Sequence, residues 1–415
     1  MKKLLGKIEF IFVVLLMILY SGGPLTVILS ANSTNEGDMA ATPDFAIIRL
    51  VFLFSYIVIG ILLIPLWRTV SYLLLKEKFI LLLAALAVIS ILWSFIPSLT
   101  LQRSVGLLGT TLFGVYLATR YSLKQQMEIL GWTFSIILIL SLLFVIALPN
   151  YGVMTGIHEG AWRGIYTHKN VLGKIMVLST AFFWLIATEA KGFNLRLNLA
   201  LGTSILLLVF SRSTSSLINF LTLIVVSSVF KVLKWRSRLT IPTLLFLLAV
   251  IILFCFLILL QLETFLGFFG KDTSFTGRSY LWPAVVMKIE EQLWLGYGFS
   301  GFWRDINSEG GDIWKATNWD PPNAHNGLLD LLLDLGLLGL SIFLLSYFMS
   351  LMKGITATNL TKSVQAVWTL VYMTYLVVAN ITESSLLIQN NIFWVLYVAI
   401  ALSLHRAVNL KEQHN

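Results

Sequence analysis

The sequence predicts an all-α integral membrane protein with about 12 transmembrane helices and a large extracytoplasmic loop that carries an amphipathic helix. Three observations support this class: the composition, the recurrence of apolar windows and the distribution of charge. Of the 415 residues, 58% are hydrophobic and only 12% are charged, and the mean hydropathy is +0.86. Such a chain has too few polar residues to cover a soluble globule.

Apolar windows of about 20 residues, the length that crosses about 30 Å of hydrocarbon, recur along the whole sequence. The first window follows two lysines, as a signal peptide would, but apolar residues continue beyond Pro24 to Leu29, which favours a first membrane helix. The single cysteine, Cys255, lies within a later window and excludes an internal disulfide. The windows are expected near residues 8–29, 45–66, 78–96, 101–119, 128–148, 170–188, 195–211, 214–230, 240–262, 327–350, 364–381 and 386–404.

The charges between these windows predict an orientation. With a cytoplasmic N-terminus, most of the 29 lysines and arginines lie on inner segments and most of the 20 acidic residues lie outside. An even number of spans then places both termini in the cytoplasm. The net charge of +9 therefore indicates an inner surface suited to anionic membrane lipids and not a nucleic-acid-binding protein. The outer side receives the polar segments 151–169, 211–216, 263–326 and 382–385.

The chain contains no internal repeat and is predicted to form a single polytopic membrane domain over residues 1–415, with the 263–326 loop inserted between spans. Within this loop, Leu281, Val285 and Ile289 recur at helical spacing. We expect this helix to lie along the membrane surface. The tryptophans that follow are expected to be interface anchors or sugar-stacking faces: Trp303, Trp314 and Trp319.

Four polar residues from separate outer segments are candidates for a shared site: Arg163, Arg212, Arg278 and His325. Arginine presents a rigid fork of donors that fits phosphate oxygens, so converging arginines would hold a pyrophosphate. A neighbouring histidine would be neutral and able to accept a proton from a sugar hydroxyl. The sequence contains no phosphate-binding glycine loop and no outer Asp-x-Asp pair for a metal. A three-histidine metal site formed by His158, His168 and His325 remains an alternative.

Several motifs resemble the bacterial O-antigen polymerase and O-antigen ligase family, including its exopolysaccharide-polymerase branch. The segment Asn323-Ala324-His325-Asn326-Gly327, followed by leucines, Asp334 and Gly336-x-x-Gly339, resembles the histidine signature of the family. The remaining matches occur in the order of the family over about residues 150–385. They are Arg163-Gly164 with His168-Lys169-Asn170 and Gly173, Ser211-Arg212-Ser213-Thr214, Thr276-Gly277-Arg278 with Trp282, Gly296-x-Gly298, and Glu383-Ser384.

The resemblance implies a metal-independent glycosyltransferase in the bacterial inner membrane, without a cofactor, that acts at the periplasmic face on undecaprenyl-pyrophosphate-linked glycans. It implies that Arg163 and Arg278 hold the pyrophosphate and that His325 is the activating base. Asp330 is an additional acid that departs from the pattern. The residues assigned to substrate binding are Arg212, Asn326, His168, Asn170, Asp334 and Glu383.

The motifs favour a polymerase, whose acceptor is another lipid-linked glycan, over a ligase, whose acceptor is the lipid A core. A chain-length regulator is a candidate partner, as are the membrane lipids. Two other readings remain open. A transporter of lipid-linked sugars would suit twelve spans. Its coupling site would place ionisable groups near the membrane midplane, whereas those of this sequence lie at predicted span ends and in outer loops. A non-catalytic scaffold would tolerate lysine in place of the arginines.

Overall fold

The computed structural model describes residues 2–29, 46–190, 192–235, 278–304, 308–317 and 320–412. Within these ranges the chain is helical and contains no β-strand, only an isolated bridge between Val153 and Trp162. The predicted all-α class is therefore confirmed. The expected window at 240–262, Cys255, the loop residues 263–277 and Trp319 lie outside the described residues, as does the side chain of Arg278.

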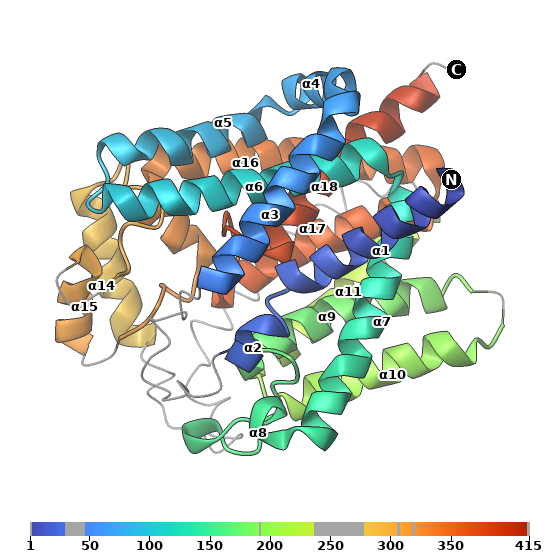
Figure 1. The fold of residues 1–415 in the computed structure, drawn as a ribbon, viewed down its shortest axis with the longest axis horizontal. Helices are drawn as coiled ribbons and strands as arrows, with labels where there is room; N and C mark the ends of the chain where they lie inside the picture. The colour runs from blue at the N-terminus through green and yellow to red at the C-terminus, as the bar shows by residue number, and fades with distance from the viewer. Residues whose placement is uncertain are drawn as a thin grey trace.

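Long helices run side by side and form the body of the protein (Figure 1). Five helical segments of the described chain are long and apolar enough to cross a membrane, so the protein is a multi-pass membrane protein: Ala46–Lys76, Leu123–Ala147, Lys169–Ala187, Gly327–Thr361 and Val364–Thr382. Four further apolar helices are shorter: Lys78–Leu92, Leu195–Phe210, Thr214–Ser228 and Ile392–His405. Each predicted window within the described ranges overlaps one of the helices α1, α3, α5, α6, α7, α9, α10, α11, α16, α17 and α18.

The bounds of these elements are as follows. The first half contains α1 (Lys2–Tyr20), α2 (Leu25–Leu29), α3 (Ala46–Leu63), α4 (Trp67–Lys76), α5 (Lys78–Ile89), α6 (Pro97–Arg120), α7 (Leu123–Ala147), α8 (Pro149–Gly152) and α9 (Lys169–Ala187). The second half contains α10 (Leu195–Phe210), α11 (Thr214–Trp235), α14 (Arg278–Glu291), α15 (Glu309–Thr317), α16 (Gly327–Thr361), α17 (Val364–Thr382) and α18 (Ile392–Glu412).

Two predicted windows differ from the observed helices. The first is broken after Tyr20 by the turn that contains Pro24. The last was expected to begin at residue 386, but α18 begins at Ile392, because the preceding residues form a turn. The side-chain oxygen of Asn380 accepts backbone hydrogen bonds from Ser385 and Leu386 and stabilises that turn. This non-helical turn carries Glu383 into the interior of the protein.

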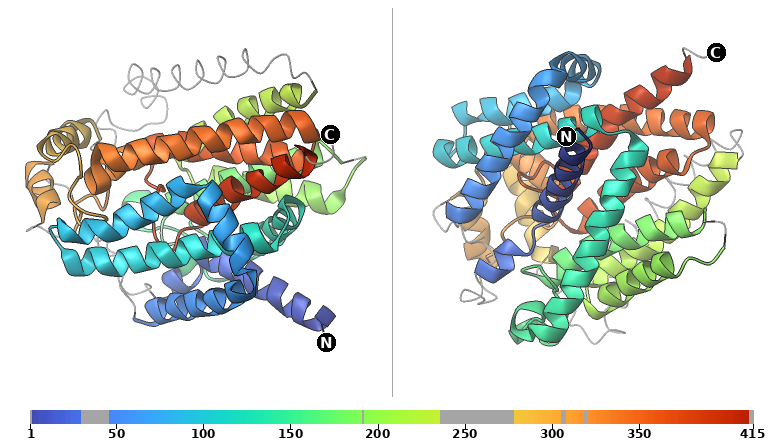
Figure 2. Two further views of the ribbon diagram at one scale, coloured as in Figure 1. Left: turned by 90° about the horizontal axis from the view of Figure 1, so that it is seen from above. Right: turned by 45° about the vertical axis from the view of Figure 1, so that its right-hand side comes forward.

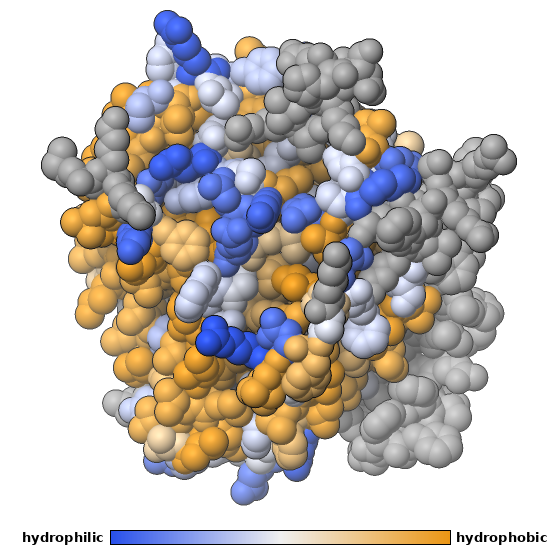
Figure 3. Space-filling model, turned by 90° about the vertical axis from the view of Figure 1, so that its right-hand side faces the viewer, coloured by the Kyte–Doolittle hydropathy of each residue, from blue (hydrophilic) through white to orange (hydrophobic). Residues whose placement is uncertain are grey.

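The two ends of the described chain lie at the same end of the bundle, whereas α14 and α15 lie at the opposite end (Figures 1 and 2). Figure 3 looks onto the end with the termini and shows hydrophilic residues gathered across a largely hydrophobic surface. The apolar positions of α14 lie on one helical face, as their spacing indicates, and Leu281, Val285 and Ile289 are buried in a small core cluster of their own. The expected position of this helix along the membrane surface stays a prediction. Helices α14 and α15, which belong to the long loop, and the two chain termini therefore lie at opposite ends of the bundle.

Helix α16 is broken at Gly336, and residues 293–298 fill the break. Gly336 has a φ of 61° and a ψ of −163°, and a Cβ there would lie 2.3 Å from the carbonyl carbon of Trp294. The N–H groups of Tyr297 and Gly298 donate to the carbonyls of Leu333 and Asp334. In return, the N–H groups of residues 337 and 338 donate to the carbonyls of residues 293 and 294. Backbone groups exposed by the break are thus paired within the protein, as an apolar environment requires.

Candidate functional site

The segment that carries His325 is fixed by hydrogen bonds from several directions. Its backbone N–H donates to the side-chain oxygen of Asn323 over 2.9 Å, and the indole of Trp282 donates to the carbonyl of Ala324 over 2.9 Å. His325 itself has a φ of 50°, a left-handed conformation that is uncommon for a residue other than glycine. Asn326 then caps α16 by accepting the N–H groups of Leu328 and Leu329. The imidazole is therefore held at a defined position in front of the helix.

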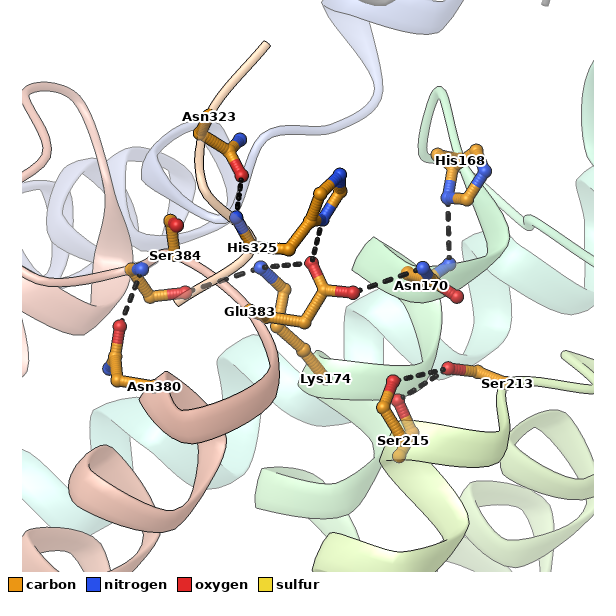
Figure 4. Close-up of polar contacts among 12 residues, drawn as sticks. His168, Asn170, Lys174, Ser213, Ser215, Asn323, His325, Asn380, Glu383 and Ser384 are labelled. Carbon is orange, nitrogen blue, oxygen red and sulfur yellow. Dashed lines mark hydrogen bonds and ion pairs between the residues drawn. The ribbon is translucent and has the colours of Figure 1, made fainter. Parts of the chain in front are cut away.

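Glu383 lies at the centre of the polar groups around this imidazole (Figure 4). Its Oε2 lies 3.9 Å from Nδ1 of His325 and 3.9 Å from Nζ of Lys174. Its Oε1 accepts a hydrogen bond of 3.1 Å from the side-chain amide of Asn170. The carboxylate thus faces an imidazole on one side and a buried ammonium on the other.

The close approach of α16 and α17 brings His325 and Glu383 together. A Cβ at Gly327 would lie 2.1 Å from the side-chain oxygen of Asn380, so only glycine allows the first turn of α16 to reach α17 at this point. Glu383 follows the last residue of α17 directly, and its backbone N–H donates to the carbonyl of Ala379. The glycine of the His-Asn-Gly motif is therefore required for the close packing of α16 against α17, and the histidine and asparagine supply polar groups to the site.

Lys174 belongs to the site and was missed by the sequence analysis. Its side chain comes from α9, is 8% exposed, and donates to the hydroxyl of Ser385 over 3.2 Å. The available signal was a lysine one turn inside the predicted span 170–188, a position where a charge needs a partner. The partner, Glu383, lies 209 residues further along the chain, so spacing alone could not identify it.

Asp330, the additional acid, holds three segments of the site in place. Its Oδ1 accepts hydrogen bonds from the indole of Trp303 over 2.9 Å and from the backbone N–H of Ala324 over 3.0 Å. Its Oδ2 accepts a hydrogen bond from the hydroxyl of Ser384. Ala324 precedes His325 and Ser384 follows Glu383, so this carboxylate positions the residues on either side of the imidazole and the glutamate.

His168 caps the first turn of α9 from the edge of the site. Its Nδ1 accepts a hydrogen bond of 3.2 Å from the backbone N–H of Asn170, which requires that this nitrogen carries no proton. Burial lowers the pKa of His168 to about 4, although the nearby carboxylate of Glu383 opposes the shift. The ring of His158 packs against it edge to face, with centroids 5.6 Å apart. No group of three metal-ligating side chains suited to a metal ion occurs among the described residues.

Arg163 is buried in the loop before α9, where it binds backbone. Its guanidinium donates to the carbonyls of Tyr151, Asn150 and Thr167 over 2.8, 3.0 and 3.4 Å. Burial lowers its pKa from the usual value, but an arginine remains charged. Three of its five N–H groups are thereby used to shape the loop that leads to His168.

The other two predicted arginines are placed differently. Arg212 is exposed, adopts a φ of 48° and extends towards the carbonyl of Glu159 over 3.4 Å. Its own carbonyl accepts a hydrogen bond of 3.4 Å from Lys169, which joins the 211–216 turn to the start of α9. Arg278 is the first residue of α14. The structure therefore brings the segments of Arg163, Arg212, His325 and Glu383 to one region.

Asp334 lies one turn beyond Asp330, beside the break in α16. Its carbonyl accepts the N–H of Gly298, and its carboxyl group interacts with the backbone of Ser300. Its hydrogen bonds are therefore with Gly298 and Ser300, beside the break, and its carboxyl group also lies in the electrostatic field of Asp330.

Taken together, the fold and the site define a multi-pass membrane protein with a histidine–glutamate–lysine cluster close to α14, the helix at the end of the bundle opposite the termini. Residues 199–344 match the family described as O-antigen ligase. The chain is also 24% identical over 267 residues to the exopolysaccharide production protein ExoQ of Rhizobium meliloti (strain 1021). That alignment covers 61% of this chain and 60% of the length of the relative.

Both comparisons confirm the predicted resemblance to the O-antigen ligase and polymerase-like family. The matched range 199–344 contains Arg212, Arg278 and His325. Lys174 and Glu383 lie outside it. Glu383 was assigned to the site from its sequence motif, whereas Lys174 joins it through the geometry.

Proposed function

We propose that this protein is a membrane glycosyltransferase that moves a glycan from undecaprenyl pyrophosphate to a sugar hydroxyl at the periplasmic face. The observation that carries the proposal is the pairing of His325 with Glu383. His325 lies beside α14, whose Trp282 donates to the carbonyl of Ala324, and α14 lies at the end of the bundle opposite the termini. In the proposed topology of twelve spans, both termini are cytoplasmic, which places this pair on the periplasmic side. Hydrophobic helices of the bundle would hold the lipid carrier beside it.

The proposed reaction uses the imidazole as a general base. The second ring nitrogen of His325 points away from Glu383 in Figure 4 and is the atom proposed to accept the proton of the acceptor hydroxyl. The hydroxyl oxygen forms a bond to the anomeric carbon while the bond from that carbon to the pyrophosphate breaks, and the diphosphate leaves with the electron pair. Glu383 holds the ring in one orientation and stabilises the imidazolium that forms. The 3.9 Å separation is longer than a hydrogen bond, and in this proposal the two groups approach each other when the histidine becomes charged.

Arg163, Arg212 and Arg278 are proposed to neutralise the departing diphosphate. Arg212 is suited to this because its guanidinium is exposed beside the carbonyl of Glu159, in the loop before α9. Arg163 can contribute through the two N–H groups that do not bind backbone, and it also shapes the loop around the donor. In this proposal no metal and no nucleotide take part.

We propose a polymerase in preference to a ligase. The name of the ExoQ relative refers to exopolysaccharide production, whereas the matching family is described as O-antigen ligase. The acceptor separates the two activities. Purified protein supplied with lipid-linked repeat units alone should produce lengthened glycans. A strict requirement for lipid A core would identify a ligase instead.

Substitution of His325 tests the catalytic proposal. His325→Ala in proteoliposomes should abolish glycan transfer while lipid-linked donor still binds. His158→Ala is the matched control, because His158 lies at the edge of the same loop cluster, where its ring packs against that of His168. If His325→Ala left transfer intact and abolished movement of the lipid-linked glycan across the membrane, a transporter would replace the enzyme.

A further inference from the structure

Helix α4 is an unusual element at the end of the bundle that carries the termini. It follows the lipid-facing helix α3 after a turn at Pro65, and within α4 only Leu73 is buried. In the apolar 18-residue window of the candidate span Ala46–Lys76, only 22% of the residues are buried, the lowest share among the candidate spans of the described chain. Ile57, Ile61 and Ile64 of this span are all exposed. The exposed apolar surface of α3 therefore continues directly into α4.

The exposed side chains of α4 and of the start of α5 combine aromatic rings with positive charges. Trp67 and Leu75 are 61% and 75% exposed, and Tyr72 is also exposed. The guanidinium of Arg68 lies 5.6 Å from the ring of Trp67, and Nζ of Lys76 lies 5.8 Å from the ring of Tyr72. In the next helix, Nζ of Lys78 lies 5.6 Å from the ring of Phe79. Each base is thus paired with an aromatic ring, as at a membrane interface.

The one acidic residue of this segment is turned inward. Glu77 lies between α4 and α5 and is fully buried. Its Oε1 lies 2.5 Å from Nζ of Lys353 on α16 and 2.9 Å from Nε2 of His405 on α18. Glu77 therefore pairs with groups of the core and adds no negative charge to the outer surface. Over residues 64–80, the exposed charged groups are Arg68, Lys76 and Lys78 alone.

We infer that α4 and the first turn of α5 form a binding surface for the phosphate headgroups of anionic phospholipids. The surface is defined by Trp67, Arg68, Tyr72, Lys76 and Lys78. Its aromatic and aliphatic side chains continue the lipid-facing surface of α3, which places the three bases at the depth of the headgroups. Three exposed cations without an exposed acid match a layer of phosphates, whereas a protein partner would have to supply an equally acidic and amphipathic face.

Native mass spectrometry of the full-length protein, released from nanodiscs that contain phosphatidylglycerol and phosphatidylcholine, tests this inference. Wild-type protein should retain phosphatidylglycerol in preference to phosphatidylcholine. The triple variant R68Q/K76Q/K78Q should reduce that preference at least about tenfold, since each base near an anionic surface contributes appreciably to binding. The charge-preserving variant R68K/K76R/K78R should retain it.

A second triple variant, K7Q/K124Q/R196Q, removes the same charge from exposed residues on α1, α7 and α10. It should leave the preference for phosphatidylglycerol within about twofold of wild type. Equal loss in the two glutamine variants would overturn the inference, because net charge alone would then explain binding. Unchanged lipid retention in R68Q/K76Q/K78Q would also overturn the inference. If the oligomeric mass changed while lipid retention did not, the surface would be a protein interface instead. Thermal unfolding of each variant shows whether the fold is intact.

Discussion

Replacing Glu383 with glutamine should destabilise the protein as well as inactivate it. Glutamine keeps the shape of the side chain and its hydrogen bond to Asn170, but it removes the charge that faces Lys174. At 3.9 Å and an effective dielectric constant of about 20, the attraction between the two charges is about 4 kcal/mol. Lys174 is 8% exposed and cannot regain this energy from water. We therefore expect Glu383→Gln to lower the free energy of unfolding by about 3 kcal/mol.

The double variant Lys174→Met/Glu383→Gln separates stability from chemistry. Methionine removes the buried ammonium, so the double variant should recover most of the lost stability. Glycan transfer should stay at least about 100-fold below wild type, because His325 still lacks the carboxylate that orients it and stabilises its charged form. Lys174→Met alone should also be less stable than the double variant, since it leaves the carboxylate without its ammonium partner.

The measurements are thermal unfolding in detergent and glycan transfer from a purified lipid-linked donor, made on the same preparations. Equal unfolding temperatures for wild type and Glu383→Gln would refute the proposed energetic role of the ion pair. Recovery of transfer in the double variant would refute the proposed role of Glu383 in orienting His325, because charge compensation would then be its only function.

Other substitutions test the remaining parts of the site. Arg163→Lys should lower both stability and transfer, because the single nitrogen of an ammonium cannot reach the three carbonyls that the three guanidinium nitrogens bind; equal activity of the lysine variant in a transfer assay would contradict this. Asp330→Ala should lower the free energy of unfolding by about 3 kcal/mol, since three hydrogen bonds to a carboxylate are lost, and transfer should fall with it; Ser384→Ala, which removes one of these bonds, should have a smaller effect in the same denaturation assay. The folded-state pKa of His168, about 4, lies below its unfolded value of 6.5, so its contribution to stability is fully present above pH 6.5 and is lost as the pH falls towards 4. Unfolding temperatures measured between pH 7.5 and pH 4.5 should therefore fall with acidification, and His168→Asn should show a shallower fall. Gly336→Ala should destabilise the protein, because a Cβ would collide with Trp294, and a variant that unfolds like wild type would show that the break in α16 is unnecessary.

Much of the architecture follows from the sequence because hydrophobic windows and helical periodicity are local properties. The expected helices occur throughout the described residues, and the buried face of α14 matches the spacing of Leu281, Val285 and Ile289. The sequence also identified His325 and Glu383 as site residues, although it gave no distance between them. The roles of these residues in catalysis remain predictions.

The features that could not be predicted depend on contacts between distant segments. The break at Gly336 is stabilised by the backbone of residues 293–298, which lie outside the helix. The leucine-rich window alone therefore predicts a continuous helix. Lys174 can be recognised as a member of a cluster only when its contact with Glu383 is known, and the same holds for Glu77 and its contact with Lys353. The backbone-binding role of Arg163 likewise depends on how its loop folds. In each case the role of the residue depends on a contact with a distant segment, and the sequence pattern does not show which segment that is.

The central claim is that the His325–Glu383 pair faces the reacting end of a lipid-linked glycan. A structure of the protein with a non-hydrolysable lipid pyrophosphate analogue tests it most directly. Our account predicts that the diphosphate lies between Arg212 and His325, with the imidazole directed at the sugar next to it. A diphosphate found at the opposite end of the bundle, beside Lys353 and His405, would contradict it.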